Sequence, residues 1–114
     1  MSSPWQSQLR QMKAFADYRG RSVRLTPERE DHILDHPEMV DLLERVEDTL
    51  AKPERVVLSV SDASVELFYK FVRETKVGDK WLCVVVKYIL DDAFVVTAYL
   101  TDKVKKGEHL WPRK

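Results

Sequence analysis

Two of the three histidines in the chain lie one helical turn apart, in the stretch HILDHPEM over residues 32–39. Side chains four residues apart share one face of a helix, so His32 and His36 would present their imidazoles together. His36 also precedes Pro37, where unpaired backbone N–H groups at the start of a second helix would attract an anion such as phosphate and favour a neutral imidazole. Because a neutral imidazole accepts a proton, His36 or His32 is a candidate general base.

Two other interpretations of these histidines stay open. Acidic neighbours at Asp31 and Asp35 raise the question of a metal site, but the stretch has neither the glutamate of an HExxH motif nor a cysteine pair. The histidines could also be ordinary solvated side chains of a surface helix. We give the metal site the least weight of the three, and we expect neither a metal nor a cofactor.

A second group of polar side chains falls on two consecutive strand-like segments. Lys87 interrupts the apolar stretch WLCVVVKYIL over residues 81–90, where an unpaired ammonium would be costly. Thr97, Tyr99 and Thr101 alternate along the stretch FVVTAYLT and would share one face of a strand. Lys87 could neutralise charge on a phosphate while the hydroxyls orient it. Threonine is also a common strand residue, and Tyr99 could be a core residue with a hydrogen-bonded hydroxyl.

Three further residues are candidates for substrate binding. Arg29 lies three residues before His32, on the same side of that helix, and could clamp a phosphate. Tyr69 and Lys70 lie in another strand-like segment, over residues 65–73, and could add to the polar patch.

The face that Lys87 occupies depends on the register of the hairpin near residues 90–93. A two- or four-residue loop would place Lys87 on the face of Val96, away from Thr97, and a three-residue loop would reverse that assignment. The sequence leaves this register open.

Helices are expected to precede the strands. Apolar residues spaced three or four apart predict a helix over residues 5–18. The stretch SVRLT predicts a short strand over 22–26. Thr26 as N-cap and Pro27 as first helical residue then predict a helix over 27–36, and Pro37 begins a further helix over 37–51.

The second half of the chain has the composition of β-strands. Four segments rich in β-branched and aromatic residues are joined by short connections, which make neighbouring strands antiparallel. They cover residues 55–60, 65–73, 81–90 and 94–101. We therefore predict an α+β fold in which N-terminal helices pack on one face of a four- to five-stranded antiparallel sheet, as a single domain over residues 1–114 with a basic tail over 102–114.

Composition narrows the class of protein. Lysine plus arginine and aspartate plus glutamate both total 19, so the chain does not carry the basic excess of a protein that coats nucleic acid. A local cationic cleft remains possible at zero net charge. The chain shows no apolar run long enough for a membrane, no signal-peptide pattern and a single cysteine, Cys83, so we expect a cytoplasmic protein with no membrane partner.

Three stretches resemble a family of small phage- and mobile-element-associated nuclease domains. The stretches are LTPEREDHILDHPEM, VVVK and VVTAYLTDKVKKGEHLW, in that order, and the resemblance spans about residues 23–111. The family is grouped with the barnase, EndoU, colicin and RelE-like nucleases, known together as the BECR fold. The resemblance implies a RelE-like topology and a metal-independent ribonuclease that uses the ribose 2′-hydroxyl as nucleophile.

The resemblance also assigns roles to individual residues. It maps the helix histidine of the family to His32 or His36, the strand lysine to Lys87, and the last-strand hydroxyl to Thr97 or Thr101. Tyr99 falls beside them. This chain departs from the family signature at Asp35, where an arginine precedes the second histidine in the family, so an anion replaces a cation beside the predicted phosphate site.

The resemblance, together with the candidate base, lysine and hydroxyls, predicts a metal-independent endoribonuclease, of the kind found as a phage- or mobile-element-associated toxin, with RNA as its substrate and a cognate inhibitor or other protein as a partner. In this interpretation His36, Lys87 and Thr97 face one cleft, within roughly 10 Å of each other, around a phosphate. The alternative is a noncatalytic protein-interaction module on the same fold, which zero net charge and Asp35 favour.

Overall fold

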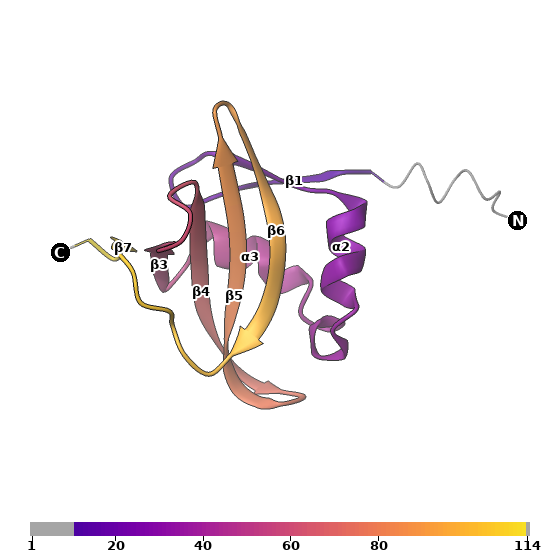
Figure 1. Cartoon of the computed structure of the whole chain (residues 1–114). Helices are drawn as coiled ribbons and strands as arrows, with labels where there is room; N and C mark the ends of the chain where they lie inside the picture. Colours follow the sequence, from indigo (N-terminus) through magenta and orange to yellow (C-terminus); the bar gives the residue numbers. More distant parts are fainter. Residues whose placement is uncertain (1–10, 114) are drawn as a thin grey trace, which may run out of the picture.

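The computed structural model describes residues 11–113, in which seven strands form one sheet (Figure 1). The strand order across the sheet is β1-β2-β6-β5-β4-β3-β7. Helix α3 lies behind the sheet in Figure 1, and helix α2 lies beside β6. The elements in chain order are β1 (Lys13–Ala16), β2 (Ser22–Leu25), α2 (Pro27–Leu34), the 3-10 turn η1 (Pro37–Met39), α3 (Glu44–Ala51), β3 (Arg55–Leu58), β4 (Val65–Thr75), β5 (Gly78–Ile89), β6 (Asp92–Thr101) and β7 (His109–Trp111).

The predicted fold, N-terminal helices on a four- to five-stranded antiparallel sheet, is wrong. The four expected meander strands are present as β3 to β6 and pair antiparallel. However, β2 runs parallel to β6, and β1 and β7 extend the two edges, so the sheet is mixed and has seven strands. The β2–β6 and β3–β7 pairings join segments that are distant in sequence, which local residue patterns do not report, whereas β1 is added by a short hairpin with β2.

The helix predicted over residues 5–18 is also wrong where the structure describes it. Lys13–Ala16 forms β1 and pairs antiparallel with β2, while residues 1–10 lie outside the described part of the chain. A tight turn decides the outcome, because Asp17 accepts hydrogen bonds from the backbone N–H groups of Arg19 and Arg21 at 2.9 Å each. This turn, with Gly20 at φ 82°, folds the segment into a hairpin.

The two central helix predictions have different outcomes. Helix α2 begins as predicted, with Pro27 as first residue and the Thr26 side chain accepting a hydrogen bond from the Arg29 N–H at 3.2 Å. The helix predicted over residues 37–51 is wrong in its first half. Pro37 begins only the three-residue turn η1, and α3 starts at Glu44. The helical N-terminus expected to attract an anion after His36 is therefore missing.

Buried apolar side chains form two clusters, one on each face of the sheet. The cluster on the helix side includes Ile33 of α2, Met39 of η1 and Leu50 of α3, packed against strand residues such as Phe68 and Val84. The cluster on the other face comprises Val57, Leu67, Tyr69 and Cys83. No helix of residues 11–113 covers this second face, which we call the open face.

The segment over residues 102–108 leads from β6 across the open face to β7 and is called the C-terminal strap. Val104 packs on the open-face cluster, and the Lys105 N–H donates to the Tyr69 hydroxyl at 3.1 Å. The Leu58 N–H donates to the Glu108 carbonyl at 2.8 Å, after which β7 pairs with β3. The strap is therefore anchored by both packing and backbone hydrogen bonds.

Gly107 is expected to be required for the strap. A Cβ atom at this position would lie 2.5 Å from the Leu58 carbonyl oxygen, which is backbone and cannot rotate away. Gly107→Ala should therefore lower the free energy of unfolding by about 1–3 kcal/mol more than Gly20→Ala, measured by urea denaturation. Gly20 is the matched control, because a Cβ there meets nothing within 4 Å and its loss comes only from the backbone strain of an alanine at φ 82°. Equal losses in the two variants would contradict the close packing of the strap.

A buried ionic network ties the β1–β2 hairpin to the centre of the sheet. The Asp17 side chain is 0% exposed and accepts from the Arg21 Nε at 2.7 Å and the Tyr88 hydroxyl at 2.7 Å. Arg19 and Arg21 also contact the buried Glu66 carboxylate, at 2.6 and 3.2 Å. Burial alone would raise the pKa of Asp17, but hydrogen bonds from Tyr88 and from the backbone of Arg21 and Arg19 lower it overall.

No helix among residues 11–113 is long and apolar enough to cross a membrane.

Candidate functional site on the open face

A β-bulge decides which predicted site residues share a face. Ile89 pairs with Asp92, so the hairpin has a two-residue loop, which would separate Lys87 from Thr97 in a regular ladder. The register shifts between the Val85 and Val86 pairs, and Val96 is the extra residue. The bulge therefore returns Thr97 to the face of Lys87, opposite the prediction for a two-residue loop.

The strand residues of the prediction are brought to the open face by this register. Thr97 lies opposite Val85, Tyr99 opposite Cys83, and Thr101 opposite Trp81. Directly opposed residues of paired strands project to the same side. Cys83 belongs to the open-face cluster, and Val85 and Trp81 pack against it. Thr97, Tyr99 and Thr101 therefore share the open face, and Tyr69 lies on it as the cross-strand partner of Cys83.

A cavity of about 540 Å³ lies over this patch, and we call it the open-face groove. The loop between β3 and β4 forms one wall, and the C-terminal strap contributes two lysines. The polar lining residues are Ser59, Ser61, Asp62, Thr97, Tyr99, Lys105 and Lys106.

Lys87 is part of an ion pair at the groove. Its Nζ lies 3.3 Å from Asp62 Oδ2, while the other Asp62 oxygen accepts from the Ser64 hydroxyl at 2.6 Å and the Ser64 N–H at 2.9 Å. The two hydrogen bonds from Ser64, followed by the Lys87 contact, lower the pKa of Asp62 to about 2. Asp62 is therefore ionised at neutral pH and offsets part of the Lys87 charge.

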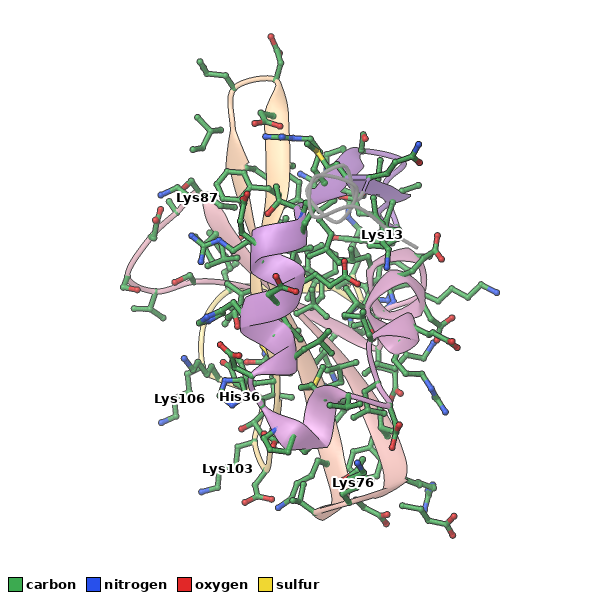
Figure 2. All side chains as sticks on the ribbon, turned by 90° about the vertical axis from the view of Figure 1, so that its right-hand side faces the viewer. Lys13, His36, Lys76, Lys87, Lys103 and Lys106 are labelled. Carbon is green, nitrogen blue, oxygen red and sulfur yellow. The ribbon has the colours of Figure 1, made fainter. Side chains whose placement is uncertain are left out.

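The positive charges of the groove come from the strap. Neither the Lys105 nor the Lys106 ammonium forms an ion pair or side-chain hydrogen bond with another residue of the range 11–113. Both side chains are exposed, and Figure 2 shows Lys106 and Lys103 extending from the molecule on the side away from α3. These lysines are free to meet an anion.

The two tyrosines on the open face, Tyr99 in the groove and the buried Tyr69, remain protonated. Burial is the main cause that raises the pKa of Tyr99 and of Tyr69, and the Cys83 thiol beneath them adds to the shift. Burial likewise raises the pKa of the Cys83 thiol, against the opposing effects of the two tyrosines and Lys105. The Tyr99 hydroxyl can therefore donate a hydrogen bond at any physiological pH, and Cys83 is a neutral core residue.

The histidines lie elsewhere. His32 and His36 are exposed at the end of α2, with their ring centroids 6.4 Å apart, and His36 Nδ1 lies 3.8 Å from Glu38 Oε1. In the described range, no hydrogen bond, ion pair or ring contact joins either histidine to Lys87 or Thr97. Figure 2 shows Lys87 near the upper end of the sheet and His36 at the lower end of α2. The structure does not bring them into the predicted common cleft.

Two of the predicted substrate-binding residues, Arg29 and Lys70, also lie away from the groove. Arg29 is exposed on α2 with the histidines. Lys70 lies opposite Leu82 on the helix side of β4, where it forms an ion pair with Asp48 at 2.8 Å and donates to the Lys52 carbonyl at 3.1 Å. These contacts hold α3 against the sheet, so Lys70 has a structural role.

Sequence reasoning missed the three charged residues that line the groove. Asp62 lies in the short loop between β3 and β4, and nothing in the local sequence predicts its contact with Lys87. Lys105 and Lys106 were noted only as part of a basic tail, because nothing local shows that the tail crosses the sheet. No group of three or more potential metal-ligating side chains converges within residues 11–113.

No family model, curated protein or solved structure matches the chain.

Proposed function

We propose that the chain is a metal-independent endoribonuclease whose site is the open-face groove rather than the histidine pair. The observation that carries the proposal is the convergence of two unpaired lysines, a hydroxyl pair and an ionised carboxylate in one cavity. The resemblance of three sequence stretches to phage-associated nuclease domains supports the choice of RNA. A toxin of that kind would act in the cytoplasm and would have a cognate inhibitor as protein partner.

The groove supplies mainly electrostatic catalysis in this proposal. Lys105 and Lys106 contact the scissile phosphate and stabilise the negative charge that develops on its oxygens. The hydroxyls of Thr97 and Tyr99 orient the phosphate through hydrogen bonds. Positioning and charge stabilisation are the largest contributions that such a site can make.

Proton transfer uses the carboxylate and a lysine. Asp62 accepts the proton of the ribose 2′-hydroxyl, whose oxygen attacks the adjacent phosphorus and expels the 5′-oxygen of the next nucleotide. Lys105 or Lys106 protonates that leaving oxygen. A pKa of about 2 makes Asp62 a weak base, so we expect slow turnover compared with an enzyme that uses a histidine base.

Cleavage should persist in EDTA and leave 2′,3′-cyclic phosphate ends, because the nucleophile is the 2′-hydroxyl and no metal takes part. Mixed cellular RNA, the matching DNA and a 2′-O-methyl RNA would be incubated with the protein and analysed on denaturing gels. His36→Ala serves as control and should cleave at the wild-type rate. Intact RNA, equal cleavage of DNA, or loss of activity in His36→Ala would each refute the proposal.

A noncatalytic protein-interaction module is the second candidate. The observation in its favour is the exposed apolar tip of the β5–β6 hairpin, where Leu90 is 100% exposed and Ile89 is 43% exposed. An inhibitor protein that binds this tip would be compatible with either function. Intact RNA in the cleavage assay, together with a partner whose binding is lost in Leu90→Ser, would favour the module.

A further inference from the structure

The open face continues beyond the groove as a pair of aromatic rings. Phe71 of β4 lies directly opposite Trp81 of β5, with ring centroids 5.3 Å apart at an interplanar angle of 74°. Trp81 also meets Tyr69 edge to face, with centroids 6.3 Å apart. The three rings form a continuous stripe that leads from the groove toward the β4–β5 turn.

The outer end of this aromatic stripe is not part of the hydrophobic core. Phe71 is 36% exposed and belongs to neither buried cluster, whereas Tyr69 is fully buried beneath the strap. The strap packs Val104 on the cluster and bonds to Tyr69, so it covers the inner end of the stripe. An aromatic side chain left outside the core costs hydrophobic free energy, which binding of a planar ligand would recover.

Cations flank the exposed rings. The Arg73 guanidinium carbon lies 5.8 Å from the centroid of Phe71, and Arg73 is exposed. The Lys103 ammonium forms no ion pair or hydrogen bond in the described part of the chain, and its backbone adjoins Thr101, the cross-strand partner of Trp81. Lys105, Lys106, Lys103 and Arg73 are therefore the cations beside the groove and the rings. The nearby carboxylates have partners, since Glu54 accepts from the Phe71 N–H at 3.1 Å and Asp102 pairs with Lys80.

Aromatic faces interleaved with unpaired cations match one ligand chemistry, that of a single-stranded nucleic acid. Its bases stack on aromatic rings while its phosphates meet lysine and arginine. An apolar peptide would gain from the rings but not from the cations. The charge complementarity thus favours a polyanion with planar side groups.

We propose that Phe71 and Trp81 form a stacking subsite for a nucleobase of single-stranded RNA, next to the phosphate held in the open-face groove. The subsite deepens the proposed ribonuclease function, on which it rests for the choice of RNA. It requires only binding, and so it can be tested with an RNA that cannot be cleaved.

The test uses Trp81 as its own reporter. The chain has three tryptophans, so Trp5→Phe and Trp111→Phe leave Trp81 as the only indole. This variant would be titrated with a 2′-O-methyl octauridine and with an abasic oligomer of the same length and charge. We expect the octauridine to quench Trp81 fluorescence and to bind about 5- to 150-fold more tightly than the abasic oligomer.

Phe71→Leu keeps an apolar side chain but removes the ring, and should abolish most of the preference for the octauridine while leaving affinity for the abasic oligomer unchanged. Ile89→Ala is the matched control, since it removes another exposed apolar side chain at the opposite hairpin. Equal affinity for the two oligomers, or an unchanged preference in Phe71→Leu, would overturn the subsite. RNA cleavage without quenching would refute the subsite alone, and quenching without cleavage would refute the nuclease alone.

Discussion

Replacing Lys105 and Lys106 together by methionine is expected to lower the rate of RNA cleavage by about 10²–10³, because the two ammonium groups meet charge that develops in the transition state. Methionine preserves the length and the apolar stem of each side chain. The Lys105 backbone N–H that donates to Tyr69 is untouched, so the strap should stay in place. Single-turnover cleavage of a fluorescent oligoribonucleotide would measure the change.

The same double variant should bind RNA with a weaker salt dependence. Each phosphate contact on a single strand contributes about 0.7 to the slope of log affinity against log salt concentration, so loss of two contacts should reduce that slope by about 1.4. A variant with Arg45→Met and Lys76→Met has the same change in net charge but alters side chains outside the groove. Figure 2 shows Lys76 at the lower end of the sheet, away from Lys106. If this control loses as much activity as the strap variant, the groove is not the site.

Replacing Asp17 by alanine is expected to cost about 3–5 kcal/mol of the free energy of unfolding, because it leaves Arg21 and the Tyr88 hydroxyl without their buried partner. Small proteins are stable by only about 5–15 kcal/mol, so the variant should be largely unfolded at modest urea concentrations. Asp92→Ala is the control. Asp92 forms an ion pair with Arg24, but its side chain is 49% exposed and solvent screens the pair, so the loss should be much smaller than that of Asp17→Ala.

The contribution of Asp17 should also depend on pH. Its pKa is lowered in the folded state, so its stabilisation is fully present above the unfolded pKa of about 3.9 and is lost as pH falls through the lower folded pKa. The difference between wild type and Asp17→Ala should therefore be constant from neutral pH down to about pH 5 and shrink below about pH 4. Urea titrations across this range would show it. A difference that persists unchanged at pH 2–3 would assign the effect to packing instead of charge.

Local signals in the sequence were sufficient to predict several secondary-structure elements. The Thr26–Pro27 pair defined the start of α2, because capping and proline geometry act within one turn. Alternating β-branched and aromatic residues defined the four antiparallel strands from Arg55 to Thr101, because such side chains suit a pleated, half-buried surface. The polar character of Thr97, Tyr99 and Thr101 on one strand face followed from the two-residue period alone.

Pairing between strands, which the spacing of apolar residues does not report, decided the other elements. Residues 13–16 form a strand because a turn at Asp17 pairs them with β2, although their apolar spacing suited a helix. The bulge at Val96 places Lys87 and Thr97 on the same face of the sheet, and no residue type in the hairpin predicts that bulge.

For the candidate site, too, the sequence predicted some of the residues and the structure alone placed the others. Residue types alone indicated a lysine and hydroxyls that could hold a phosphate, since that chemistry belongs to the side chains. Only the tertiary structure moved the histidines away from them and placed Lys105 and Lys106 over the sheet, because β7 pairs with β3 and the connecting strap must cross the open face. A strand pairing between residues some fifty positions apart is set by the packing of the whole sheet, which no local stretch of the chain encodes.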